Sequence, residues 1–118
     1  MRIVHRLQAG LAIVALLLGA AAAAQVIDAE RLAQIDAHAL AAPPEAETAP
    51  GKLARYLAQP ARNDAEKARA IFRWIADRIH YDVNAYFGEK LEKIDADQVL
   101  AQRGAACDGY ATLFEALG

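Results

Sequence analysis

Hydrophobic residues recur at helical spacing along most of the chain that follows residue 28. The strongest pattern predicts a helix that begins after Asn63 and ends near His80 and Tyr81, with charged residues on its other side. Its hydrophobic stripe consists of Ala68, Ile71, Phe72, Ile75 and Ile79. Asn63 and Glu66 have the spacing of a capping box at the start of this helix, and Asp64 is the alternative cap.

Four further helices are predicted, over residues 28–41, 52–58, 95–103 and 107–117. Asp95 and Gln98 predict a second capping box, and Gly104 is the expected terminator of that helix. The residues of the last helix that we expect to face inward are Tyr110, Ala111, Phe114 and Leu117. Most of the chain that follows residue 28 is therefore expected to be α-helical.

The segments between the helices are expected to be irregular. Residues 42–51 contain three prolines and predict a linker. Residues 81–88 hold four hydrophobic side chains without a helical period and predict an aromatic loop. No strand pair is predicted, so the expected fold class is mainly α.

The first 24 residues have the pattern of a targeting segment. Arg2, His5 and Arg6 precede an uncharged run from Leu11 to Ala24, which ends in small residues. This order is typical of a secretory signal that is cleaved after Ala24. The alternative is an uncleaved membrane anchor, but the run is shorter than the roughly 20 apolar residues of a spanning helix. The chain is therefore expected to be secreted or periplasmic, without stable membrane insertion after cleavage.

Composition and charge bear on the partners and cofactors that the chain can be expected to bind. The chain has 118 residues, 24% of them charged, and a formal net charge of −2. These values are typical of a single folded domain and give no reason to expect nucleic acid as a partner. One cysteine and three scattered histidines form no metal-binding pattern, so neither a metal nor another cofactor is expected.

The single cysteine, Cys107, is the main candidate for chemistry. It stands at the predicted start of the last helix, where unpaired backbone N–H groups and the positive end of the helix dipole stabilise a thiolate. The same N–H groups suit a developing oxyanion. From position alone, three interpretations stay open: a nucleophile, a buried structural cysteine, and a cysteine that forms an intermolecular disulfide.

Three stretches of sequence bear on this choice. They run from Lys67 to Asp82, from Ala96 to Gly104 and from Cys107 to Phe114. In this order they resemble the transglutaminase-like superfamily, with the closest likeness to its kyphoscoliosis-peptidase type, over residues 52–118. Ala105 stands where the family usually has glycine. The expected domains are the signal (1–24), an N-terminal helix with a Pro-rich linker (25–51) and, from the resemblance, part of a transglutaminase-like domain (52–118).

The resemblance implies a fold and a reaction. The fold is the helical half of a papain-like α+β core, whose sheet is expected beyond Gly118. The reaction is hydrolysis of an amide, or transfer of its acyl group, through a thioester on Cys107, with a protein or peptide as substrate. The family uses a Cys–His–Asp triad in that order, and no histidine follows Cys107 here. We therefore expect this chain alone to be inactive and to expose an apolar patch that involves Ile75, Ile79, Phe114 and Leu117.

Other residues have simpler interpretations. His80 is expected to be a helix-end histidine rather than a substitute base, and Asp108 to stabilise its helix. Asp95 is expected to act as a cap and Asp97 as a solvated surface residue. The aromatic residues expected in the core, with a substrate cleft as the alternative, are Trp74, Tyr81, Tyr86 and Phe87. The alternative functions are a non-catalytic helical scaffold or binding module of the cell envelope and an exported helical binding protein.

Overall fold

The computed structural model describes residues 29–88 and 93–118. The chain divides into two compact units, residues 1–33 and 34–118. In the first unit the described residues, 29–33, are helical. The predicted signal, residues 1–24, lies outside the described residues, so signal cleavage and export stay predictions. None of the helices in the described ranges is both long and apolar enough to cross a membrane.

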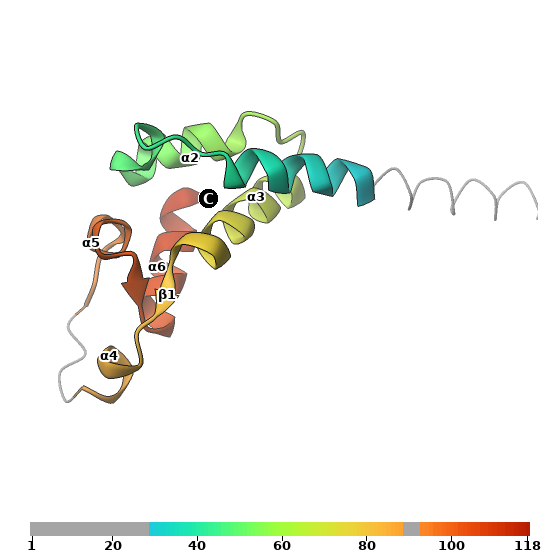
Figure 1. Cartoon of the computed structure of the whole chain (residues 1–118). Coiled ribbons are helices and arrows are strands. Elements are labelled where there is room, and N and C mark those ends of the chain that lie inside the picture. The colour runs from blue at the N-terminus through green and yellow to red at the C-terminus, as the bar shows by residue number, and fades with distance from the viewer. Residues whose placement is uncertain (1–28, 89–92) are drawn as a thin grey trace, which may run out of the picture. The chain divides into compact units, whose positions relative to one another are not determined.

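The second unit is mostly helical, which confirms the predicted fold class (Figure 1). Residues 34–40 are helical and lead into the following elements. In chain order these are η1 (Ala46–Thr48), α2 (Pro50–Ala58), α3 (Asp64–Arg78), β1 (His80–Tyr81), α4 (Val83–Phe87), α5 (Ala96–Gln102), β2 (Gly104–Ala105) and α6 (Cys107–Leu117). In Figure 1, α6 runs from the β1–β2 pair towards the C-terminus, which lies beside α2 and α3.

The predicted caps of α3 and α5 are present. Asn63 Oδ1 accepts a hydrogen bond from the Glu66 N–H at 2.9 Å, so Asn63 rather than Asp64 is the N-cap of α3. At α5 the capping box is complete, because Asp95 and Gln98 each accept from the backbone N–H of the other. Short-range side-chain acceptors of this kind satisfy the first N–H groups of a helix, which is why the sequence reveals them.

The buried face of α3 differs from the predicted stripe. The buried residues of α3 are Ala70, Ile71, Trp74 and Ile75. Phe72 was expected in the core but is 58% exposed. The helical period allows several neighbouring stripes, and the packing partners select the one that buries the largest side chain, that of Trp74, which is fully buried.

Two predicted irregular segments are more ordered than expected. Pro50 does not close the linker but begins α2, where its missing N–H costs nothing, and a 3₁₀ turn occupies residues 46–48. The predicted aromatic loop contains the helix α4, which Asp82 caps by accepting from the Ala85 N–H at 3.0 Å. The two short helices that the sequence did not predict, η1 and α4, contain no buried residues.

The predicted absence of a strand pair is wrong. β1 and β2 pair in parallel, with His80 opposite Gly104 and Tyr81 opposite Ala105. Gly104 is therefore a strand residue and not the terminator of α5. Arg103 ends that helix in the left-handed conformation, with φ 57° and ψ 26°. Ala105 lies in a buried strand and does not have a positive φ, so it fits the position where the family usually has glycine.

One hydrophobic core joins the helices of the second unit. Ile35 and Ala39 of the first helical segment are fully buried in it, so this segment is part of the domain rather than an appendage. α6 contributes Leu113 and Leu117, of which only Leu117 was predicted. The other large buried side chains include Leu53, Leu57, Trp74 and Val99.

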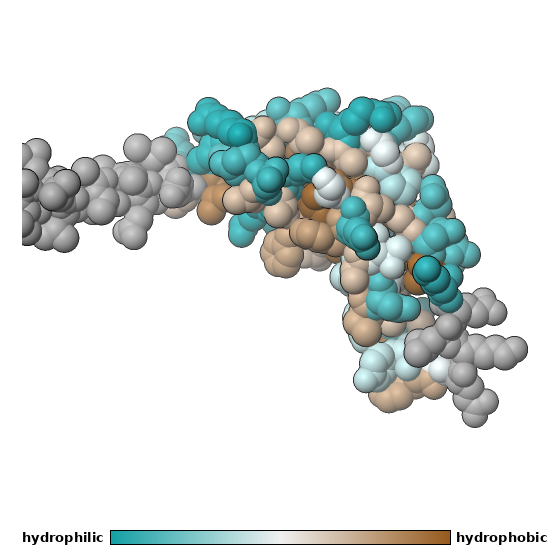
Figure 2. Space-filling model, turned by 180° about the vertical axis from the view of Figure 1, so that it is seen from behind, coloured by the Kyte–Doolittle hydropathy of each residue, from teal (hydrophilic) through white to brown (hydrophobic). Residues whose placement is uncertain are grey.

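An apolar groove lies between α3 and α6. Its volume is about 270 Å³, and it is lined by Phe72, Ile75, Ala76, Tyr110, Ala111 and Phe114. Phe114 and Ala111 were expected to face inward, but both are exposed along this groove. Of the patch predicted from the sequence, Ile75, Ile79 and Leu117 are in fact buried, and Phe114 is 40% exposed. Hydrophobic and hydrophilic surface alternates on the face drawn in Figure 2.

Candidate functional site

Cys107 is the first residue of α6 and its thiol is exposed. The prediction that it begins a helix is therefore confirmed. The exposure argues against the interpretation of a buried structural cysteine. In the described residues no hydrogen bond to the Cys107 thiol is present, so the sulfur is open to an approaching electrophile.

The parallel pairing of β1 and β2 determines what lies next to Cys107. The Asp82 N–H donates to the Ala105 carbonyl at 3.0 Å, and the His80 N–H donates to the Arg103 carbonyl at 2.9 Å. In a parallel pair the carboxyl ends of both strands lie at the same edge. The chain that leaves β1 at Tyr81 and Asp82 therefore runs beside the chain that leaves β2 towards Cys107.

The start of α6 has no side-chain cap. Its N-cap residue is Ala106, which is extended and offers no acceptor. By contrast, Asn63, Asp82 and Asp95 cap the helices α3, α4 and α5 with side-chain oxygens. A cap would occupy the first N–H groups of α6. Without one, these groups remain available to an anion held at Cys107.

Aromatic residues cluster where the chain leaves β1. The ring centroid of Tyr81 lies 6.1 Å from that of Tyr110 and 6.5 Å from that of Tyr86, and Phe87 packs edge-on against Tyr86. Tyr81, Tyr86 and Phe87 were expected in the core, but all three are exposed. They form an exposed aromatic cluster on β1 and α4, which Tyr110 connects to α6.

The electrostatic surroundings of Tyr81 raise the pKa of its hydroxyl. Desolvation by burial is the main cause that raises the pKa of Tyr81, and negative charge on Cys107, Tyr86, Asp108 and Tyr110 raises it further. Tyr81 is therefore a neutral phenol at physiological pH. A neutral phenol hydroxyl can donate a hydrogen bond.

Two contacts hold α6 in place. The Tyr110 hydroxyl donates to the Ile79 carbonyl at 2.7 Å, which joins the first turns of α6 to the end of α3. Gly109 has no side chain where one would collide with Ala105, since an added Cβ would lie 2.4 Å from the Ala105 Cβ. The close approach of α6 to β2 thus depends on glycine at this position.

The histidines do not complete the site among the residues that the structure describes. His80 lies in β1 rather than at a helix end, and its ring packs against Gly104. His38 stacks on Tyr56 with ring centroids 4.2 Å apart, and its Nε2 lies 2.8 Å from the Tyr56 carbonyl. His5 is outside the described residues. Within the described ranges no cluster of His, Cys, Asp or Glu has the arrangement of a metal site.

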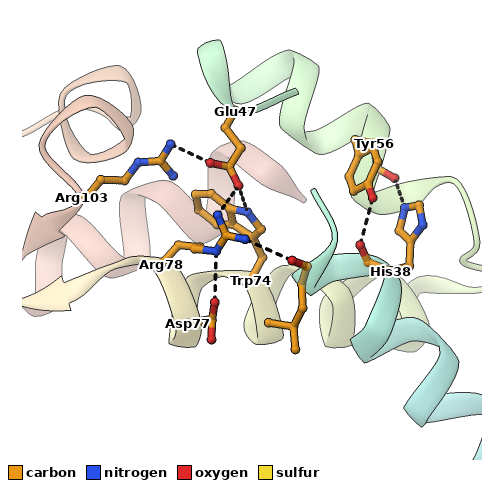
Figure 3. A network of polar contacts seen from close by, with 8 residues as sticks. His38, Glu47, Tyr56, Trp74, Asp77, Arg78 and Arg103 are labelled. Atoms are coloured by element: carbon orange, nitrogen blue, oxygen red, sulfur yellow. Dashed lines mark hydrogen bonds and ion pairs between the residues drawn. The ribbon is translucent and has the colours of Figure 1, made fainter. Parts of the chain in front are cut away.

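The sequence did not point to a polar cluster that lies behind the site. Glu47, from the predicted linker, accepts hydrogen bonds from Trp74, Arg78 and Arg103 (Figure 3). Arg103 and Glu47 are 56 residues apart in the chain. A single carboxylate in an Ala- and Pro-rich segment carries no local signal, so no spacing rule could have identified this contact.

Comparisons with known proteins identify the family of the chain. The family model of the transglutaminase-like superfamily matches residues 51–118. Kyphoscoliosis peptidase of Mus musculus is 39% identical over 64 residues, which are 54% of this chain and 10% of that protein. Kyphoscoliosis peptidase of Homo sapiens is 38% identical over 64 residues, with the same shares.

The chain thus spans about a tenth of the length of these curated relatives. No solved structure shows a significant match. The family model covers more than half of the 118 residues and includes α2, α3, the strand pair and α6. The chain belongs to the transglutaminase-like superfamily.

Proposed function

We propose that Cys107 is the nucleophile of a cysteine-dependent peptidase or acyl transferase. The observation that carries the proposal is an exposed thiol on the first residue of an uncapped helix, in a chain of the transglutaminase-like superfamily. The thiolate is the reactive form of cysteine, and the unpaired N–H groups of the first turn of α6 lie next to the sulfur's residue. The substrate is an amide in a protein or peptide.

In the proposed reaction the Cys107 sulfur attacks the carbonyl carbon of the amide. The carbonyl oxygen gains negative charge, which the free N–H groups at the start of α6 stabilise. The C–N bond then breaks, the amine leaves with a proton from a general acid, and a thioester remains on Cys107. Water or a second amine attacks the thioester, which gives hydrolysis or cross-linking.

The general acid and base are not supplied by the histidines of the described residues. His80 and His38 make the structural contacts described above, and neither is hydrogen-bonded to the thiol. We expect the histidine and aspartate of the triad to follow Gly118 in the whole protein. This chain alone should therefore not turn over an amide, because proton transfer to the leaving amine and from the attacking water is missing; an activated ester, whose leaving group needs no proton, can still acylate the thiol.

The test is acylation of the 118-residue chain by p-nitrophenyl acetate. Sulfur attack on the ester carbon breaks the C–O bond and releases p-nitrophenolate, which is measured by absorbance. We expect one equivalent of rapid release and a hydroxylamine-sensitive acetyl group on Cys107. The rate should exceed that of the denatured chain severalfold, because only the folded chain offers the N–H groups at the start of α6 to the developing oxyanion.

Cys107→Ser is the matched control, because it removes the thiol and keeps the size of the side chain. Its release should fall to the slow background of lysine acetylation. Equal rates for the folded and the denatured wild-type chain would contradict the proposal. They would favour the alternative, a non-catalytic helical module in which Cys107 has no special reactivity.

The N-terminal segment bears on where the protein is located. We propose that the chain is exported and that its signal is cleaved after Ala24. The support is the order of basic, apolar and small residues at the N-terminus. Mass spectrometry of the exported protein should give Gln25 as its first residue, and an N-terminus at Met1 would contradict cleavage.

A further inference from the structure

Glu47 is the most enclosed charged side chain among the ion pairs of the described residues, with 8% of its side chain exposed. Its Oε1 accepts from Trp74 Nε1 at 2.9 Å and from Arg78 Nη1 at 3.0 Å. Its Oε2 accepts from Arg103 Nη2 at 2.8 Å. Figure 3 shows the carboxylate between these three side chains. One buried carboxylate therefore joins η1 to α3 and to the residue that follows α5.

Arg103 is the partner that matters for the site. It is a non-glycine residue with positive φ. This backbone conformation costs about 1 kcal/mol or more, so other contacts of the residue must offset the cost. The bond to Glu47 and the position of its guanidinium 5.2 Å from the centre of the Trp74 ring hold it. The side chain of Arg103 is thus fixed from the domain core.

The backbone of Arg103 leads directly to Cys107. After its left-handed turn the chain forms β2, which has two residues, and then begins α6. The Arg103 carbonyl accepts from the His80 N–H, and this bond starts the pairing with β1. Each strand has two residues, so the pair makes few backbone hydrogen bonds. We therefore expect the pairing to depend strongly on the fixed turn at Arg103.

We infer that Glu47 is a positioning residue of the Cys107 site, supplied by the segment that precedes the family region at residue 51. The inference rests on the proposed function of Cys107. Glu47 acts through Arg103, whose turn directs β2 and the start of α6. The residues before the family region are then part of the functional unit and not only a linker.

Glu47→Gln tests the inference, and Asp36→Asn is its matched control. Both replace a carboxylate with an amide of the same shape, and both remove an ion pair between the N-terminal segment and the rest of the domain. Asp36 bonds to Arg69 of α3, at 2.7 Å and 2.6 Å, and has no link to the turn at Arg103. Only the Glu47 variant should disturb the site.

The first measurement is hydrogen exchange of the His80 and Asp82 amides. Glu47→Gln should accelerate both about tenfold or more, since loss of a charged partner weakens the local structure. Asp36→Asn should stay within about twofold of the wild type. The second measurement is acetylation of Cys107 by p-nitrophenyl acetate, which should slow several-fold in Glu47→Gln and remain unchanged in Asp36→Asn.

Equal exchange rates in Glu47→Gln and the wild type, or equal acceleration in both variants, would overturn the inference. If Glu47→Gln does not fold, Arg103→Gln removes the same bond from its other end and should give the same result. Failure of the proposed function has a different signature, because the wild-type thiol would then react no faster than the denatured chain. The exchange rates do not depend on thiol chemistry.

Discussion

At the scale of single residues, the site depends on side chains that are small or absent. Gly109 lets α6 approach β2, where an added Cβ would meet the Ala105 Cβ at 2.4 Å and side-chain atoms of Ile94 and Val99 at 3.2 Å. Ala106 leaves the first N–H groups of α6 without a side-chain acceptor. The thiol of Cys107 therefore stands at the start of a helix that packs closely on β2 and whose first N–H groups have no side-chain cap.

Gly109→Ala should therefore destabilise the domain. The added methyl group meets another Cβ rather than the end of a flexible side chain, so α6 or β2 must shift, at a cost of about 1–3 kcal/mol. The expected result is a lower midpoint in urea with an unchanged slope.

Gly51→Ala is the control for this substitution. Gly51 also lies in a helix, but its nearest contact for an added Cβ is the end of the Arg55 side chain at 3.9 Å. Alanine should be tolerated there or should stabilise α2 by up to about 1 kcal/mol, since it is the better helix former. Equal destabilisation by both substitutions would show that the close approach at Ala105 is not the cause.

At the scale of elements, ion pairs attach the N-terminal segment to α3. Asp36 and Arg69 form a two-bond pair that is partly exposed. The hydrogen bonds from Arg69 lower the pKa of Asp36; partial burial opposes this, and the charges of Arg69 and Arg73 lower the pKa further. A carboxyl whose pKa is lower in the folded chain stabilises the fold only where it is ionised.

The pair predicts a specific dependence on pH. The stabilisation by Asp36 is fully present above the ordinary aspartate pKa of 3.8 and is lost as pH falls through the lower pKa that Asp36 has in the folded chain. Asp36→Asn should lower the free energy of unfolding at pH 7 by about 1 kcal/mol or less. The difference from the wild type should shrink below about pH 4.

Urea unfolding at pH 7 and pH 3 measures both quantities. Asp97→Asn, at an exposed position in α5, is the control and should show no comparable change between the two pH values. A difference between wild type and Asp36→Asn that is the same at pH 7 and pH 3 would contradict the assignment to the ionised carboxylate.

At the scale of the whole molecule, the described part of the chain buries one core and leaves one apolar groove uncovered. Phe72 and Phe114 line this groove from α3 and α6, and both are exposed. Contiguous apolar surface of this kind binds other apolar surfaces. The chain on its own should therefore associate weakly and bind hydrophobic dyes.

Substitution of groove residues should reduce this behaviour. We expect Phe72→Ser and Phe114→Ser each to lower the fluorescence of bound anilinonaphthalene sulfonate by roughly half, in proportion to the apolar area removed. Phe87→Ser is the matched control, because Phe87 is 76% exposed and does not line the groove. Equal loss in all three variants would assign the dye to exposed phenylalanine in general rather than to the groove.

The sequence was informative where the determining contacts are local. The caps at Asn63 and Asp95 act over three residues, and the helix from Cys107 to Leu117 was predicted with its observed bounds. It was misleading about which face of a helix is buried, as with Phe72 and Phe114. Several faces fit the same helical period, and only the packing partners choose between them.

The sequence by itself therefore determined the mainly helical class, the helix caps and the place of Cys107 on the first residue of a helix, because spacings of three or four residues encode these features. Tertiary structure alone decided the β1–β2 pairing and the exposed aromatic cluster of Tyr81, Tyr86 and Phe87. It also decided the contact between Glu47 and Arg103 across 56 residues of chain. Such contacts arise only when distant segments pack together, and no local pattern of residues specifies them.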